Sequence, residues 1–200
     1  MDNPKNIIVI GGAMGSMEAL RSIFAGLAAG LPAAILVVVH GSPDRTLDLP
    51  TVLGRYTHWP VAYAEEGCTI KAGHIYIAPQ ASHLEIETPG VIRLSTKPTP
   101  YPVHQEVDTL FASAAAAYGD KVISIILSGS GEDGTQGAIA ITEAGGWNII
   151  QEISEAAKPG MPENALRFDD PDEQVPASRI SAQLQEAVAT RLAPVPLQKQ

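Results

Sequence analysis

The sequence predicts an α/β fold: a three-layer domain with a mainly parallel, doubly wound sheet and an inserted β-hairpin. Three observations predict this class. Short apolar runs rich in Val and Ile end at glycine-rich segments, helical patterns separate these runs, and one stretch of short strands with turn residues interrupts the alternation. With 200 residues, of which 45% are hydrophobic and 18% charged, the chain has enough apolar material for one sizeable core.

Four runs have the character of sheet strands. They are short, β-branched and mostly continuous in their apolarity, as expected for strands that are buried on both faces. The first is followed by Gly11-Gly12, the second by His40-Gly41 and the third by Ser128-Gly129. The runs cover residues 7–10, 33–39, 121–127 and 148–151.

Three segments between these runs have the composition or the apolar spacing of helices, and glycines close each of them. They cover residues 16–27, 106–118 and 135–143. The order strand, helix, strand predicts a parallel sheet, because parallel neighbours need a crossover connection. Ligands of open parallel sheets bind beyond the carboxyl ends of the strands, so the site is expected at that edge.

The stretch from Trp59 to Ser95 has short apolar segments separated by Gly and Pro. This pattern predicts one additional sheet strand followed by a β-hairpin at 83–94. Alternating prolines predict an extended crossing at 97–102, and residues 193–200 are expected to be a disordered tail. We therefore expect a single domain over residues 1–192.

Charge and cysteine content exclude several classes of protein. Asp and Glu number 22 against 13 Lys and Arg, and a surface with the resulting charge of -9 repels phosphate backbones, so no nucleic-acid partner is expected. The single cysteine, Cys68, cannot form an intrachain disulfide, which favours a reducing compartment. The N-terminal residues resemble neither a signal peptide nor a membrane span. We expect a cytoplasmic protein without membrane insertion.

Two predicted strand ends carry residues with catalytic potential. His40 ends an apolar run, and Asp133 lies in a loop bracketed by glycines. An imidazole and an orienting carboxylate are two members of a nucleophilic triad, whose third member is then expected in the loop at 11–16. Plainer interpretations exist for both residues. His40 can be a hydrogen-bonded strand-end residue, and Asp133 an acid that stabilises the start of the next helix.

A remote alternative is a dinucleotide-binding domain. The segment 11–15, between a strand and a helix, is a loose relative of the glycine-rich loop that holds pyrophosphate at a helix N-terminus. Its glycine spacing is not G-x-G-x-x-G, however. The second strand also ends in His40 and not in the Asp or Glu that binds a ribose hydroxyl.

Several short motifs follow one another along the chain. They are Ile10-Gly11-Gly12, Leu31-Pro32 before the strand that leads to Val39-His40, Gly73 to Pro79 followed by His83-Leu84, Val107 to Phe111, Leu127 to Gly134, and Gly160-Met161-Pro162. Together they resemble the catalytic domain of the CheB-type protein-glutamate methylesterases of bacterial chemotaxis. The resemblance covers about residues 6–188 and rests on the whole set, because each motif is weak by itself.

The resemblance implies an activity and a set of site residues. Members of that family hydrolyse glutamate methyl esters on chemoreceptors with a serine, a histidine and an aspartate, and without a metal or an organic cofactor. The family's histidine falls on His40, its aspartate on Asp133 and its serine on Ala13. The implied partner is a methylated chemoreceptor or another signalling protein. The oxyanion and site-loop residues that the resemblance implies are Gly12, Met14 and Ser130.

The sequence departs from the family's pattern at three points. A methyl group at Ala13 cannot attack an ester, and the candidate substitute nucleophile, Ser16, lies about 5 Å further along the predicted helix. Residues 103–106 read Val-His-Gln-Glu where the family has His-Arg-Pro-Ser, so Glu106 adds negative charge where glutamate-rich receptor segments bind. We also expect no receiver domain of the kind that many members carry, because 200 residues leave no room for one.

Two interpretations within the resemblance remain open. In the first, the protein is an active methylesterase or amidase that uses Ser16, or water activated by His40. In the second, it is a catalytically inactive binding or scaffolding relative in signalling. Ala13 arises either by divergence or by deliberate substitution, and the altered segment 103–106 favours divergence. We expect activity on methylated receptor to be very low or absent.

Overall fold

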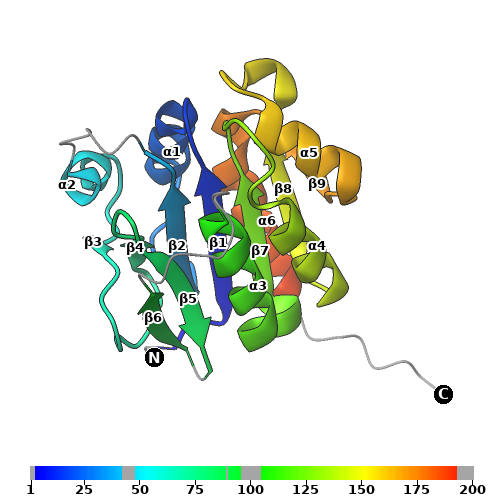
Figure 1. Cartoon of the computed structure of the whole chain (residues 1–200). Coiled ribbons are helices and arrows are strands. Elements are labelled where there is room, and N and C mark those ends of the chain that lie inside the picture. The colour runs from blue at the N-terminus through cyan, green and yellow to red at the C-terminus, as the bar shows by residue number, and fades with distance from the viewer. Residues whose placement is uncertain (1–2, 42–47, 89, 96–104, 193–200) are drawn as a thin grey trace.

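The computed structural model describes residues 3–41, 48–88, 90–95 and 105–192 (Figure 1). Its centre is a seven-stranded sheet with the order β3-β4-β2-β1-β7-β8-β9, in which each pairing is parallel. A separate antiparallel pair, β5-β6, forms a hairpin. The predicted fold class is confirmed. The strands are β1 (Asn6–Gly12), β2 (Ala33–Val39), β3 (Val61–Tyr63), β4 (Ile75–Ile77), β5 (His83–Glu87), β6 (Val91–Ser95), β7 (Val122–Ile126), β8 (Trp147–Gln151) and β9 (Glu173–Val175).

Helices cover both faces of the sheet and make the three layers (Figure 1). On one face lie α1 (Ser16–Ala25) and α6 (Ala177–Leu192); on the other, α3 (Glu106–Tyr118), α4 (Thr135–Glu143) and α5 (Gly160–Phe168) lie with the hairpin. The short elements are α2 (Leu49–Leu53) and 3-10 turns at Gly54–Tyr56, Gly119–Lys121 and Ile153–Glu155. Among the described helices, none has both the length and the apolarity needed to cross a bilayer.

Strand β1 shows why the central runs are continuously apolar. Ile7 and Val9 belong to the core on the α3 face, and Ile8 and Ile10 belong to the core on the α1 face. All four side chains are fully buried. Alternate side chains of a strand point to opposite faces, so a strand with helices on both sides needs an apolar residue at every position.

The stretch 59–95 differs from its prediction. The sequence predicts one additional sheet strand there, and the structure has two: β3 pairs with β4, and β4 pairs with β2. Each is only three residues long, which is too short to carry a clear periodic signal. The hairpin itself is confirmed, with Leu84 opposite Leu94.

Most other boundaries agree closely with the sequence. The helices predicted at 106–118 and 135–143 have those bounds, and the first helix ends at Ala25, before Gly26. The short strand β9 and the helices α2, α5 and α6 were not predicted. The proline-rich segment 97–102 and the tail 193–200 lie outside the described residues.

Candidate functional site

The carboxyl ends of β1, β2 and β7 bring the candidate residues to one edge of the sheet. Gly12 pairs with Val39 in parallel register, and the His40 N–H donates to the Gly12 carbonyl at 2.9 Å. The Ala13 N–H donates to the Ser128 carbonyl, also at 2.9 Å. Residue 13 therefore follows β1 between two neighbours: the end of β2, which carries His40, and the loop after β7.

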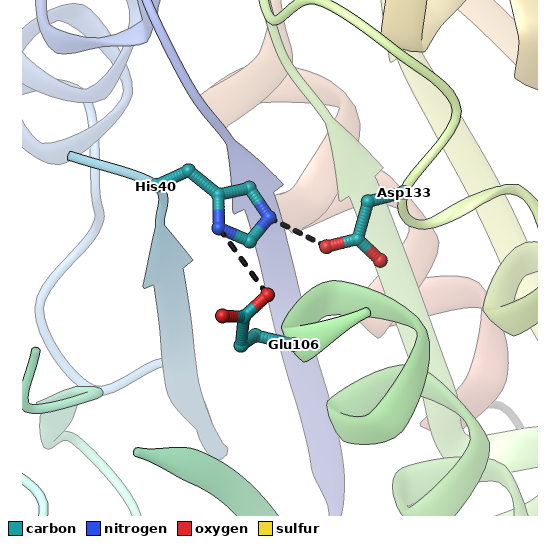
Figure 2. Close-up of side chains that lie close together, drawn as sticks. All are labelled: His40, Glu106 and Asp133. Carbon is teal, nitrogen blue, oxygen red and sulfur yellow. Dashed lines mark hydrogen bonds and ion pairs between the residues drawn. The ribbon is translucent and has the colours of Figure 1, made fainter. Parts of the chain in front are cut away.

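The side chains of His40 and Asp133 meet at this edge. His40 Nε2 lies 2.5 Å from Asp133 Oδ2 (Figure 2). The Asp133 side chain is buried, and its carboxylate also accepts the backbone N–H groups of Val107, at 3.0 Å, and Asp108, at 2.9 Å. These bonds from the start of α3 fix the orientation of the carboxylate. The structure thus brings together the two residues that the sequence pairs.

A second carboxylate faces the other nitrogen of the same imidazole. Glu106 Oε2, at the start of α3, lies 3.5 Å from His40 Nδ1 (Figure 2). Burial lowers the pKa of His40, but the hydrogen bond to Asp133 and the charges of Asp133 and Glu106 outweigh it, so the pKa is raised above its ordinary value. The two carboxylates therefore favour the imidazolium form.

Asp108 lies next to Asp133 and connects α3 to the start of α4. Its Oδ1 accepts the backbone N–H groups of Gly134, at 2.9 Å, and Gly137, at 2.8 Å, at the start of α4. Burial raises the pKa of Asp108 to about 6, helped by the nearby charge of Asp133 and opposed by the backbone N–H groups that the carboxylate accepts. The loop that carries Asp133 is therefore tied to α3 from both sides.

Ala13, the residue that the resemblance pairs with the family's serine, carries only a methyl group. Ala13 is half-buried and packs against the core on the α3 face. Ser16, the candidate substitute, is fully buried at the start of α1, and its hydroxyl donates to the Ala13 carbonyl at 2.7 Å. The Ser16 hydroxyl is therefore engaged within the first turn of its own helix.

The predicted site-loop residues border position 13. Gly12 is buried in β1, and the Met14 side chain is 61% exposed. The Met14 carbonyl accepts the hydroxyl of Ser128 at 2.9 Å, which joins the loop after β1 to the loop after β7. Ser130 lies exposed in that second loop. Their role in binding an oxyanion stays a prediction.

His40, Glu106 and Asp133 are also the described residues whose ligand atoms come close enough to suggest a metal ion, all within 4.8 Å of one another. The two ring nitrogens face different carboxylates, however, so an ion bound at one nitrogen lies away from the other. Asp133 also accepts two backbone N–H groups, and an ion would displace its bond to His40. This donor set fits a hydrogen-bonded cluster better than a metal centre, and we derive no step through a metal.

Sequence reasoning missed the roles of Glu106 and Asp108. The sequence indicates Glu106 only as a change of charge, although its place before Val107, in the first turn of a predicted helix, is a signal that it lies near the site. Asp108 gave no usable signal. Its partners Gly134 and Gly137 lie more than 25 residues further along the chain, and only the packing of α3 on α4 brings them within reach.

The comparison with protein families decides the relationship. The family model described as CheB methylesterase matches residues 8–184. The chain belongs to the CheB methylesterase family. Curated relatives named protein-glutamate methylesterase/protein-glutamine glutaminase include one from Symbiobacterium thermophilum, 31% identical over 185 residues, and one from Pseudomonas aeruginosa, 32% identical over 190 residues. These alignments cover 92% and 94% of this chain but 51% and 54% of the relatives.

A solved structure agrees with the family model. The crystal structure of the Thermotoga maritima CheB methylesterase catalytic domain matches with a TM-score of 0.84 and 33% identity, over 90% of this chain and 97% of that one. The chain spans about half the length of the curated relatives it matches. The predicted resemblance is confirmed, and the dinucleotide-binding alternative finds no support in these matches.

Proposed function

We propose that this chain is a CheB methylesterase-family domain that binds a glutamyl side chain of a signalling protein but hydrolyses its methyl ester very slowly or not at all. The observation that carries the proposal is the methyl group of Ala13, which follows β1 at the edge where His40 and Asp133 meet. The intact fold and the retained His40–Asp133 pair favour a binding role over loss of the whole site.

The chemistry explains why the hydroxyl matters. In a complete triad, the hydroxyl attacks the ester carbonyl, the imidazole takes its proton and then protonates the departing methoxide as methanol. The carboxylate holds the imidazole in position, which Asp133 is placed to do through Nε2. Without a nucleophile no acyl-enzyme forms, and only slow attack by water is left.

Ester hydrolysis without a hydroxyl at residue 13 could use Ser16 or a water molecule, and the structure favours neither. The Ser16 hydroxyl is buried and donates to the Ala13 carbonyl, and a nucleophile must reach a near-attack position within about 1 Å to be effective. Water activated by His40 requires a neutral imidazole, which the two flanking carboxylates disfavour. Both observations support very low esterase activity.

The proposed partner is a methylated chemoreceptor or another signalling protein with accessible glutamyl groups, met in the cytoplasm. The relatives' names specify glutamate esters and glutamine amides as substrates. The net charge of -9 argues against nucleic acid as the partner. Glu106 adds negative charge beside His40, so esterified or amidated side chains fit this edge better than free carboxylates.

Methanol release tests the esterase part of the proposal. The unmodified chain, Ala13→Ser and Ser16→Ala are assayed with a methylated chemoreceptor and with a glutamate methyl-ester peptide. We expect no release above buffer from the unmodified chain and from Ser16→Ala. Substantial release by the unmodified chain, abolished in Ser16→Ala, would show that Ser16 is the nucleophile and that the proposal is wrong.

Binding tests the other part. Calorimetric titration with receptor fragments in the esterified and the free-acid forms measures whether the domain recognises the glutamyl group. We expect the esterified form to bind more tightly, and His40→Ala to weaken this preference. Equal affinity for both forms, or no binding of either, would contradict a role in recognising these side chains.

A further inference from the structure

We propose that Glu106 is a second block on esterase chemistry, because its carboxylate lies 3.5 Å from the His40 nitrogen that a hydroxyl on residue 13 needs. This inference rests on the proposed function and deepens it. The missing hydroxyl is then only one of two obstacles to ester hydrolysis. A hydroxyl at residue 13 alone gives little activity, because Glu106 still faces the His40 nitrogen.

The two ring nitrogens have separate partners. Asp133 Oδ2 lies 2.5 Å from Nε2, so the two ring nitrogens are exchanged relative to the serine-protease triad, in which the carboxylate binds Nδ1 and the hydroxyl faces Nε2. A triad imidazole uses one nitrogen for the carboxylate and the other for the hydroxyl, so a nucleophile on residue 13 would need Nδ1. In this structure Nδ1 faces Glu106 Oε2 at 3.5 Å (Figure 2). Residue 13 is joined to the same edge, since its preceding residue, Gly12, accepts the backbone N–H of His40.

The fold holds Glu106 in place beside the ring. Glu106 is the first residue of α3, where the helix dipole stabilises a negative charge. Its side chain is only 22% exposed, and the Oε2 atom that faces His40 is buried. A flexible surface carboxylate is screened by water, but this one acts on the imidazole at short range.

The cluster also weakens the general base. His40 faces two carboxylates, Asp133 from the loop before α4 and Glu106 from α3, and Asp108 adds a third acid behind Asp133. A protonated imidazole cannot accept the proton of an attacking hydroxyl. Glu106 therefore both faces Nδ1 and favours the protonated form of the ring.

The activity test compares single and double variants. Ala13→Ser alone introduces the hydroxyl, and Ala13→Ser with Glu106→Ser also removes the carboxylate that faces Nδ1. We expect the double variant to release methanol up to about tenfold faster than Ala13→Ser near pH 7, because the carboxylate facing Nδ1 is gone and the pKa of the ring is lower without it. The double variant's activity should also rise at lower pH than that of Ala13→Ser. Equal rates and equal pH profiles would overturn the proposal.

A titration of His40 tests the same inference without any activity. The ring signals of His40 are followed by NMR from pH 5 to 9 in the unmodified chain, Glu106→Gln and Glu106→Ser. We expect the titration midpoint of His40 to fall in both variants. The matched control is Glu132→Gln, which removes an exposed acid from the loop next to Asp133. A midpoint that moves no more in the Glu106 variants than in the control would overturn the proposal.

The two readouts separate this inference from the proposed function. If neither serine variant releases methanol, the family chemistry proposed for this site fails, and the His40 titration still decides whether Glu106 controls the ring. Urea unfolding of every variant, with Glu106→Gln as the variant closest in shape, identifies losses that come from misfolding.

Discussion

Asp133, in the loop before α4, stabilises the start of α3, and Asp108, in α3, stabilises the start of α4. Asp133 accepts the N–H groups of Val107 and Asp108 in the first turn of α3, and Asp108 accepts those of Gly134 and Gly137 at the start of α4. Helix N-termini leave backbone N–H groups without partners inside the helix, and carboxylates satisfy them well. The carboxylate that holds His40 is therefore positioned by a reciprocal pair of contacts.

The first prediction concerns the acceptor role of Asp108. Asp108→Asn keeps an oxygen that can accept both N–H groups, and Asp108→Ala leaves them without it. Because both variants remove the charge, their difference isolates the hydrogen bonds, and we expect the Ala variant to be less stable by about 1–3 kcal/mol. Urea unfolding at pH 7 measures this difference. The control pair, Glu143→Gln and Glu143→Ala on the exposed end of α4, should differ by less than about 0.5 kcal/mol.

The second prediction concerns pH. The pKa of Asp108 rises from 3.8 to about 6 on folding, so between these values the folded protein binds more protons than the unfolded chain. The contribution of protonated Asp108 to the free energy of unfolding is therefore complete below about pH 3.8. It decreases as the pH rises and is lost above about pH 6. Discounted for partial solvent exposure, the loss is about 1–2 kcal/mol.

Asp108→Asn removes this dependence, and the remaining titrating groups are common to both proteins. Urea unfolding of the unmodified chain and of Asp108→Asn from pH 4 to 6.5 should show the Asn variant gaining relative stability as the pH rises. A constant difference across this range would show that Asp108 does not titrate as its burial requires.

Much of the fold was readable from the sequence, for a physical reason. The central strands are buried on both faces, so their apolar runs are uninterrupted, and glycines mark the ends of α1 and α4. Strands β3 and β4 gave weaker signals because three residues cannot establish a period. β9 reads Glu-Gln-Val and pairs only with β8 at the sheet edge, where burial imposes little on sequence.

The site was readable only in part. His40 and Asp133 could be paired because each follows a parallel strand, and such strand ends share an edge. The second carboxylate on the ring could not be predicted, because the approach of Glu106 depends on how far α3 extends over β1 and β2. Sequence patterns give the existence of a helix, but contacts at its first residue come from packing.

The third prediction tests the close packing of α3 on α4. A Cβ on Gly137 would lie 2.4 Å from Phe111 Cβ and 3.1 Å from the Asp108 backbone. Alanine normally favours a helix by about 1 kcal/mol over glycine. Here the added Cβ clashes with α3, so we expect Gly137→Ala to destabilise the protein by about 1–3 kcal/mol.

The control is Gly54→Ala. Gly54 has a φ of -61°, and a Cβ added there has no atom nearer than 3.9 Å. It should be neutral or slightly stabilising in the same thermal and urea measurements. A neutral Gly137→Ala would show that the helices can move apart without cost.

The fourth prediction concerns Ser128, which joins the loops around residue 13. Its hydroxyl donates to the Met14 carbonyl at 2.9 Å and accepts the Lys158 N–H at 2.9 Å. The side chain is fully buried. Ser128→Ala leaves both backbone groups without this partner, so we expect a loss of about 1–2 kcal/mol, or about 2–8 °C in Tm.

The location of the effect distinguishes this role from general destabilisation. Hydrogen exchange should accelerate at residues 13–16 and 157–160 in Ser128→Ala, and the centre of β1 should keep its protection, because the lost bonds lie only in the loops. Ser154→Ala is a suitable control, since its exposed hydroxyl makes only a 3.5 Å contact with Glu152. In combination with Ala13→Ser and Glu106→Ser, Ser128→Ala should lower methanol release more than it lowers stability, because a nucleophile misplaced by about 1 Å loses most of its effectiveness. An activity loss that only follows the unfolded fraction would assign Ser128 to stability alone.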